Sequence, residues 1–171
     1  GRGEDALATL QAGAPGEARG RHPTSVEERA AWEEVMLEAL EATGHHQEAQ
    51  QRRWAEFERT LSIPLLRTYL KGLADFDDVE AEDQAKAVAR RFPRFDAALA
   101  FFVSWPDFPA ASRLVLSRSG EINGADDILI TEAARRLEGS YPLAATLLLR
   151  ASIQHVLTYG VATRYADAAR Q

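Results

Sequence analysis

The sequence predicts an all-α fold from three observations. Residues 142–159 have the pattern of one long helix, in which Arg150 is the only charged residue. Several shorter segments with apolar residues at helical spacing precede it. No segment alternates apolar and polar residues with a period of two for long enough to form a strand. Since a helix as apolar as 142–159 requires neighbours on several faces, we expect it to lie inside a layered helical domain.

Length and composition bound the kind of protein. At 171 residues with no cysteine, the chain can bury roughly 70% of its unfolded surface and needs no disulfide to fold. It has no apolar leader and no uninterrupted apolar run of about 18 residues, so we expect a cytoplasmic protein without a membrane span. Eighteen of the 20 basic residues are arginine, which indicates a bacterial source. Because the chain begins with Gly1 and its only methionine is Met36, we also expect it to be part of a longer protein.

Residues 1–24 are expected to form a flexible arm or linker. Only residues 5–11 have the pattern of a short helix. A high density of Gly and Pro marks a linker, and the residues that supply it here are Gly13, Pro15, Gly16, Gly20 and Pro23. We therefore place the start of the α-helical domain at residue 25 and extend that domain to residue 171.

The domain opens with two amphipathic helices. Ser25 and Glu28 have the spacing of a capping box at a helix start. The helix that they begin ends at Gly44, a residue type suited to the left-handed C′ position. Residues 46–60 form the next helix, and two amphipathic helices joined by a short glycine turn are expected to pack antiparallel.

Proline and acidic residues mark the starts of the middle helices. Pro64, Pro93 and Pro109 fall in the first turns of three of them, where proline is tolerated. Six carboxylates in residues 75–83 precede a further helix that runs to Arg91. Acidic residues at a helix start are stabilised by the helix dipole.

Glycine residues divide the last part of the chain. The Asn123-Gly124 pair is typical of a turn, and a helix over residues 126–138 follows it. After residues 142–159, Gly160 is expected to stop the helix. Residues 162–171 are then expected to fold back as the second helix of a hairpin.

Three helix starts resemble the second helix of a tetratricopeptide repeat. Residues 44–49, 107–111 and 164–168 each place a bulky side chain three residues before a small alanine, at Ala49, Ala111 and Ala168. In that repeat the alanine lets two helices approach closely. The separations between these alanines are not multiples of the usual period of about 34 residues, so no strict repeat survives. The resemblance implies antiparallel helical hairpins stacked as a tetratricopeptide-like superhelix.

Four segments are similar to an uncharacterised bacterial family of helical-repeat domains. They comprise residues 53–62, 70–82, 97–102 and 141–151, and the resemblance extends over residues 26–171. It implies a domain that often occurs in longer proteins, some of them beside a SWIM-type zinc finger. The family has no established activity, so the resemblance implies no functional residues. The cysteine and histidine ligands of such a finger are absent from this chain.

No metal or catalytic motif appears. Counted from Asp75, the sixth and twelfth positions of an EF-hand loop hold Glu80 and Ala87 in place of the required Gly and Glu. Ser117 and Ser119 lack the Gly-x-Ser-x-Gly pattern of a nucleophile turn. No two histidines have the spacing of a zinc-protease helix; they are His22, His45, His46 and His155. We therefore predict no catalytic, cofactor-binding or metal-binding residue, and we interpret His155 as a hydrogen-bonded core or groove residue.

Arg90, Arg91 and Arg94 flank Phe92 and Phe95. Basic residues interleaved with aromatic rings are typical of a groove for an acidic peptide or for single-stranded nucleic acid. The alternative is that the rings enter the core and the arginines pair with the carboxylates of residues 78–83. We favour this alternative because the two clusters bracket the same short helix.

If Arg150 is buried, it is predicted to lie in an ion pair. It interrupts the apolar helix over residues 142–159, and breaking a buried pair costs about 3 to 5 kcal/mol. We therefore expect an Asp or Glu of a neighbouring helix beside it.

The sequence predicts a non-catalytic protein interaction or scaffold module. Helical arrays leave a concave face on which a protein or peptide partner binds, and exposed terminal faces favour homo-oligomers. The alternative is an accessory domain of a nucleic-acid-associated protein that acts through its arginines. The net charge of −6 argues against this alternative, because affinity for nucleic acid depends mainly on clustered basic residues. A hydrolase would place His155 in a pocket beside carboxylates.

Overall fold

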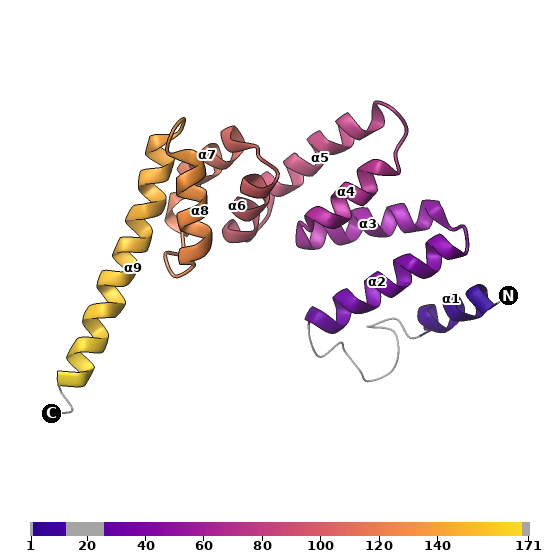
Figure 1. Cartoon of the computed structure of the whole chain (residues 1–171), viewed down its shortest axis with the longest axis horizontal. Coiled ribbons are helices and arrows are strands. Elements are labelled where there is room, and N and C mark those ends of the chain that lie inside the picture. Colours follow the sequence, from indigo (N-terminus) through magenta and orange to yellow (C-terminus); the bar gives the residue numbers. More distant parts are fainter. Residues whose placement is uncertain (1, 13–25, 169–171) are drawn as a thin grey trace. The chain divides into compact units, whose positions relative to one another are not determined.

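The computed structural model describes residues 2–12 and 26–168, and every regular element in these ranges is helical (Figure 1). The predicted all-α class is therefore confirmed. In chain order the elements are α1 (Arg2–Ala12), α2 (Val26–Ala42), α3 (His46–Thr60), α4 (Ile63–Lys71), α5 (Asp77–Arg91), α6 (Phe95–Ser104), α7 (Phe108–Ser117), the short 3₁₀ helix η1 (Ser119–Glu121), α8 (Asp127–Leu137) and α9 (Pro142–Ala168).

The chain divides into two compact units. Unit 1 comprises Gly1–Arg59 with Pro64–Leu73, and unit 2 comprises Thr60–Ile63 with Ala74–Gln171. Each unit has its own set of buried apolar side chains and is described by itself.

The core of unit 1 is formed by α1, α2, α3 and α4. Leu7 of α1 is buried against α2, so a packed helix lies inside the predicted arm. Residues 13–25, including the predicted cap Ser25, lie outside the described part of the chain. The buried residues of this core are Leu7, Met36, Leu37, Leu40 and Ala49, with Leu10, Trp32, Ala39 and Leu65 packed against them.

Gly44 ends α2 as predicted. Its φ of 80° lies in the left-handed region that glycine adopts without strain. The amide of Gly44 donates to the Glu41 carbonyl and that of His45 donates to the Leu40 carbonyl, which satisfies the last turn of the helix. Across the turn, Arg53 of α3 donates to Glu41 at 2.7 Å and so ties the two helices together.

Unit 2 is built around α6. Its buried residues occupy most of the helix: Phe95, Ala98, Leu99, Phe101, Phe102 and Val103. The helix contacts α5, α7 and α8. The interior helix of this unit is therefore α6, whereas the sequence predicts that the long apolar helix, α9, holds that position.

Two predictions about α9 are wrong. The helix is covered on one side only: Ala144, Ala145 and Leu148 are buried against α7 and α8, while Leu143 and Leu149 are exposed. It also continues through Gly160 to Ala168, where the sequence predicts a turn and a second helix. A glycine inside a helix costs about 1 kcal/mol, which weakens the helix without ending it.

A close approach between α9 and the turn before α8 fixes the position of α9. Gly124 is buried in this turn, and a Cβ atom there would lie 2.1 Å from the carbonyl oxygen of Ala151. One turn further along the chain, Asp127 accepts a hydrogen bond from the hydroxyl of Ser152 at 3.0 Å. The absence of a side chain at Gly124 therefore lets the middle of α9 seat against unit 2.

Candidate functional site

The side of α9 that faces away from α7 and α8 carries a row of exposed apolar residues. We call this row the α9 face; it comprises Leu149, Ile153, Val156 and Leu157, whose exposed fractions are 44%, 60%, 62% and 62%. These residues follow the spacing i, i+4, i+7, i+8, which places apolar side chains in one stripe along a helix. A stripe of this kind normally packs on a core. On α9 a second, smaller set of residues performs that packing.

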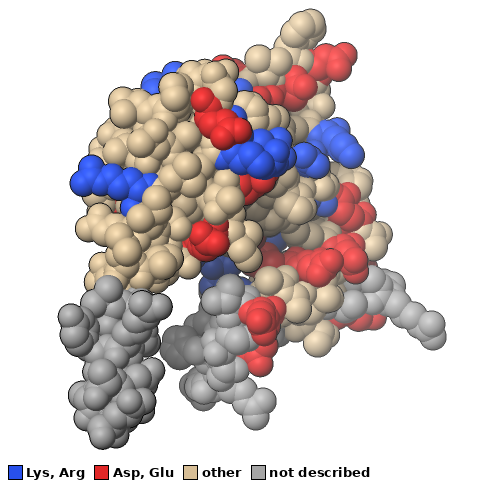
Figure 2. All heavy atoms as spheres, turned by 60° about the vertical axis from the view of Figure 1, so that its left-hand side comes forward, with Lys and Arg blue, Asp and Glu red and all other residues tan. Residues whose placement is uncertain are grey.

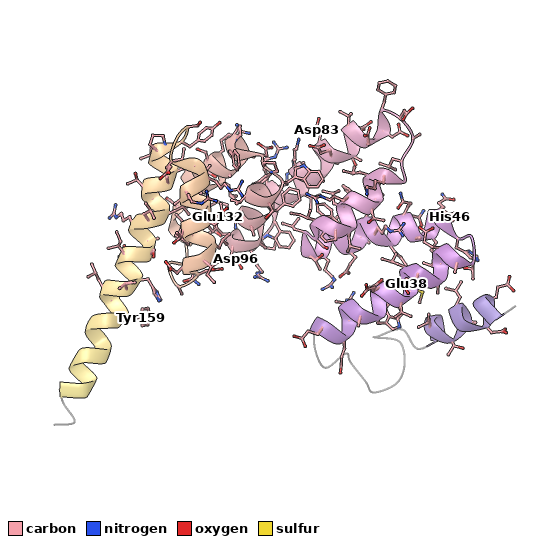
Figure 3. All side chains as sticks on the ribbon, in the orientation of Figure 1. Glu38, His46, Asp83, Asp96, Glu132 and Tyr159 are labelled. Atoms are coloured by element: carbon pink, nitrogen blue, oxygen red, sulfur yellow. The ribbon has the colours of Figure 1, made fainter. Side chains whose placement is uncertain are left out.

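The end of the α9 face extends beyond the support of its own unit. His155 is the last partly buried residue of α9 among its described side chains, and residues 156–159 are all exposed. Four successive residues cover a full helical turn, so this turn meets solvent on every side. Figure 1 shows α9 extending past α8, and Figure 3 shows Tyr159 on the part that extends. The described geometry thus presents an apolar helical rod to solvent.

Charge is nearly absent from this surface. Arg150 is exposed and forms no ion pair with a described residue, so the burial that would require a carboxylate partner is absent. Since water surrounds the guanidinium, it requires no carboxylate partner. Figure 2 shows the side of the molecule on which α9 lies as mostly tan, with few acidic or basic residues.

His155 packs against aromatic and backbone atoms. Its ring lies 4.4 Å from the Tyr159 ring, measured between centroids, and its Cβ borders the turn at Gly124. The nearby carboxylate of Asp127 accepts a hydrogen bond from Ser152. In the described ranges 2–12 and 26–168, no three His, Cys, Asp or Glu side chains converge as a metal site would require.

The acidic cluster of residues 75–83 forms the start of α5 and lies mostly in solvent. Glu82 accepts from Lys86 at 2.6 Å and from the indole N–H of Trp105 at 3.1 Å, and Glu80 accepts from Gln84 at 3.3 Å. Just before the helix, Phe76 adopts a left-handed φ of 76° and is 86% exposed. The sequence pattern identifies the helix start but gives no sign of this exposed ring.

The arginines at and after the end of α5 do not pair with these carboxylates. Arg94 pairs with Asp96, and the Nε of Arg90 donates to the carbonyl of Lys86 in its own helix. The predicted pairing with residues 78–83 is therefore wrong, although the prediction that the rings turn inward is confirmed for Phe95, which is buried, and partly for Phe92.

Arg118 is a contact that sequence reasoning missed. Its two Nη atoms donate to the carbonyls of Phe92 and Pro93, each at 2.8 Å, and its guanidinium also pairs with Glu121. These bonds hold the turn between α5 and α6 against η1. The sequence offers no signal for them, because the partners are backbone atoms about 25 residues away.

An open depression lies between α5 and α7. It has a volume of about 550 Å³ and is lined by Arg90, Ala110, Arg113, Leu114, Leu116 and Ser117. Arg90 and Arg113 are both exposed, and neither forms an ion pair with a described carboxylate; the Nε of Arg90 donates to the carbonyl of Lys86. The depression therefore combines an aliphatic floor with two exposed cationic groups.

The contacts of Glu82 predict an acid-sensitive step in the stability of unit 2. The hydrogen bonds from Lys86 and then from Trp105 hold the pKa of Glu82 below its ordinary value. A carboxyl with a lowered pKa stabilises the fold fully above its unfolded pKa, and this contribution is lost as the pH falls through the folded pKa.

We therefore expect the urea midpoint of the parent protein to fall more steeply below about pH 5 than that of Glu82→Gln, which can still accept from Trp105. Circular dichroism measures both midpoints. Parallel pH profiles would show that Glu82 contributes nothing to acid stability.

One of three comparisons with known proteins finds a match. No curated protein and no solved structure matches the chain. Within the described residues, no helix is long and apolar enough to cross a membrane. A family model, described as a family of unknown function (DUF6880), matches residues 1–171. The chain therefore belongs to this family of unknown function.

Proposed function

We propose that the chain is a non-catalytic protein interaction module that binds its partner through the α9 face. The observation that carries this proposal is the exposure of about 60% at Ile153, Val156 and Leu157, on a helix that extends past its own unit. A short helical segment is only marginally stable in water unless one of its faces packs on another surface. Contiguous exposed apolar surface of this kind marks interaction sites.

The shape and charge of the α9 face indicate the chemistry of the partner. An exposed helix with anchors at i, i+4, i+7 and i+8 fits the helix-in-groove mode of recognition, in which a protein supplies a complementary apolar groove. Arg150 is the only charge beside these anchors. We therefore expect binding to depend little on salt, since screening acts on charges and not on apolar contacts.

Two buried alanines support the finer proposal of tetratricopeptide-like helix pairs. Ala49 and Ala111 are fully buried near the starts of α3 and α7, where a small side chain allows close helix approach. The side chain of Ala168 lies outside the described set. The lack of cysteine and the arginine-rich composition support a bacterial protein of a reducing compartment.

A cross-linking experiment tests the proposed function. A photoreactive amino acid is placed at Ile153 in the parent protein in its native cells, with Thr131, an exposed residue of α8, as the matched control position. We expect a discrete protein cross-link from position 153 only. The captured protein is then purified and its affinity for each variant is measured. We expect Val156→Asp to lower the affinity at least tenfold, a change of about 1.4 kcal/mol or more, and Thr131→Asp to leave it unchanged. Equal cross-linking from both positions, or equal affinity of both variants, would contradict the proposal.

The nucleic-acid alternative has less support. Arg94 and Arg118 are engaged in ion pairs, and the described surface of the depression offers aliphatic side chains where base stacking needs aromatic ones. In a filter-binding assay at low salt we expect no retention of single-stranded DNA. Retention with steep salt dependence would favour the alternative.

A further inference from the structure

The depression between α5 and α7 is built for an acidic ligand with an apolar side chain. Arg90 and Arg113 each present guanidinium N–H groups that no described carboxylate occupies, while Ala110, Leu114 and Leu116 supply an aliphatic surface between them. Guanidinium groups bind carboxylates with charge-assisted hydrogen bonds. A ligand that matches this site therefore carries carboxylates next to a large apolar group.

A segment of the same chain has this composition. Phe76 is 86% exposed, and Asp75, Asp77 and Asp78 flank it, all exposed, with Val79 at 62% exposure. We call residues 75–79 the acidic knob. The left-handed φ of Phe76 is costly for a residue with a bulky side chain. The strained backbone directs a large apolar ring into water among carboxylates.

The acidic knob cannot reach the depression of its own chain. The knob comprises the two residues before α5 and the start of its first turn, and Arg90 lies in the last turn of the same helix. At 1.5 Å per residue the two are separated by roughly 20 Å along a rigid helix. Both belong to unit 2, so their positions at opposite ends of α5 do not depend on unit 1.

We propose that a second copy of this chain inserts its acidic knob into the depression, with Phe76 on the aliphatic floor and its flanking carboxylates beside Arg90 and Arg113. The contact is head-to-tail: after one insertion, each copy still has either its acidic knob or its depression free, at opposite ends of α5, to contact a further copy. Contacts of this type generate rings or open filaments. The inference is independent of the α9 face.

Sedimentation velocity with two complementary variants tests the proposal. All measurements use the full chain carrying Ile153→Asp, so that association through the α9 face does not contribute. Phe76→Ala removes the apolar ring of the knob and leaves the depression intact. Arg113→Glu reverses a charge in the depression and leaves the knob intact. We expect concentration-dependent growth of the parent that weakens at high salt, and loss of that growth in each variant. A mixture of the two variants can form one interface only, so we expect it to give dimers and nothing larger.

Matched controls separate this contact from general effects of the substitutions. Ile128→Ala removes an apolar side chain that is also 86% exposed, and Lys71→Glu makes the same change of charge sign in unit 1. Both should associate like the parent. Circular dichroism checks that every variant is folded.

Three results would overturn the proposal. The first is a parent that stays monomeric up to roughly 1 mM, the weak limit of specific association. The second is a mixture that remains monomeric. The third is capture of a labelled single-stranded oligothymidylate by the parent and not by Arg113→Glu, which would assign the depression to nucleic acid.

Discussion

Gly124→Ala is expected to destabilise unit 2 by about 3 kcal/mol, the upper part of the range for overpacked sites. The added Cβ would lie 2.1 Å from the carbonyl oxygen and 2.6 Å from the carbonyl carbon of Ala151, and 2.9 Å from the Cβ of His155. These neighbours are the backbone and the inner part of a side chain, so a rotamer change cannot relieve the clash. Either the turn or the middle of α9 must move. Urea unfolding followed by circular dichroism measures the loss of stability.

Two other glycines of unit 2 are the controls. A Cβ at Gly120 or Gly139 would meet no atom within 4 Å. We expect Gly120→Ala and Gly139→Ala to stay within about 0.5 kcal/mol of the parent. If Gly124→Ala unfolds at the same urea concentration as these controls, α9 does not seat against the turn as described.

Leu148→Ala is expected to cost about 2 to 5 kcal/mol. Leu148 is the large side chain of α9 that is fully buried, and Ala144 and Ala145 beside it are too small to replace its contacts. Removing its side chain leaves a cavity where α9 rests on α7 and α8. Denaturant unfolding of the full chain measures the loss of stability. Lower protection of the α9 amides from hydrogen exchange would show that the loss is located in α9.

The neighbouring residue provides the matched control for this prediction. Leu149→Ala removes the same number of atoms from a side chain that is 44% exposed. We expect its stability to change by no more than about 0.5 kcal/mol, while binding through the α9 face weakens. Equal destabilisation by the two substitutions would mean that the two sides of α9 are not distinguished by packing.

Local signals predicted the helices well because they act within a few residues. Residues 46–60 were predicted as one helix, and α3 has these bounds. Gly44 has the left-handed conformation expected of it. Other caps were missed: the side chains of Asp107 and Asp126 accept from the amides of Ala110 and Leu129, and begin α7 and α8. Both are standard N-cap residues, so the signal was present in the sequence.

The position of α9 could not be predicted in the same way. An apolar composition shows that a helix avoids water on several sides, but it does not show whether the same chain supplies the cover. Here α7 and α8 reach one side, and the buried set of Ala144, Ala145 and Leu148 is small. The helix of unit 2 with most of its residues buried is α6, whose short apolar sequence gives no stronger signal than that of α9.

Contacts between residues distant in the sequence were the other feature that the sequence could not predict. The arginines near Phe92 were expected to reach the acids of α5, yet Arg94 pairs within its own turn, with Asp96. Phe92 and Pro93 instead accept from Arg118, which lies after α7. Charge alone does not choose among several partners of the same sign. That choice depends on how the turns are packed.

The central claim is that the α9 face meets solvent in the isolated chain and is covered by a partner. Because the chain has no cysteine, single cysteines at Ile153 and at Leu148 can be compared directly by their rates of reaction with a thiol reagent. We predict that Ile153→Cys reacts almost as fast as it does in urea, that Leu148→Cys is strongly protected, and that the bound partner slows the reaction of Ile153→Cys alone. Equal protection at the two positions in the isolated chain would contradict the account.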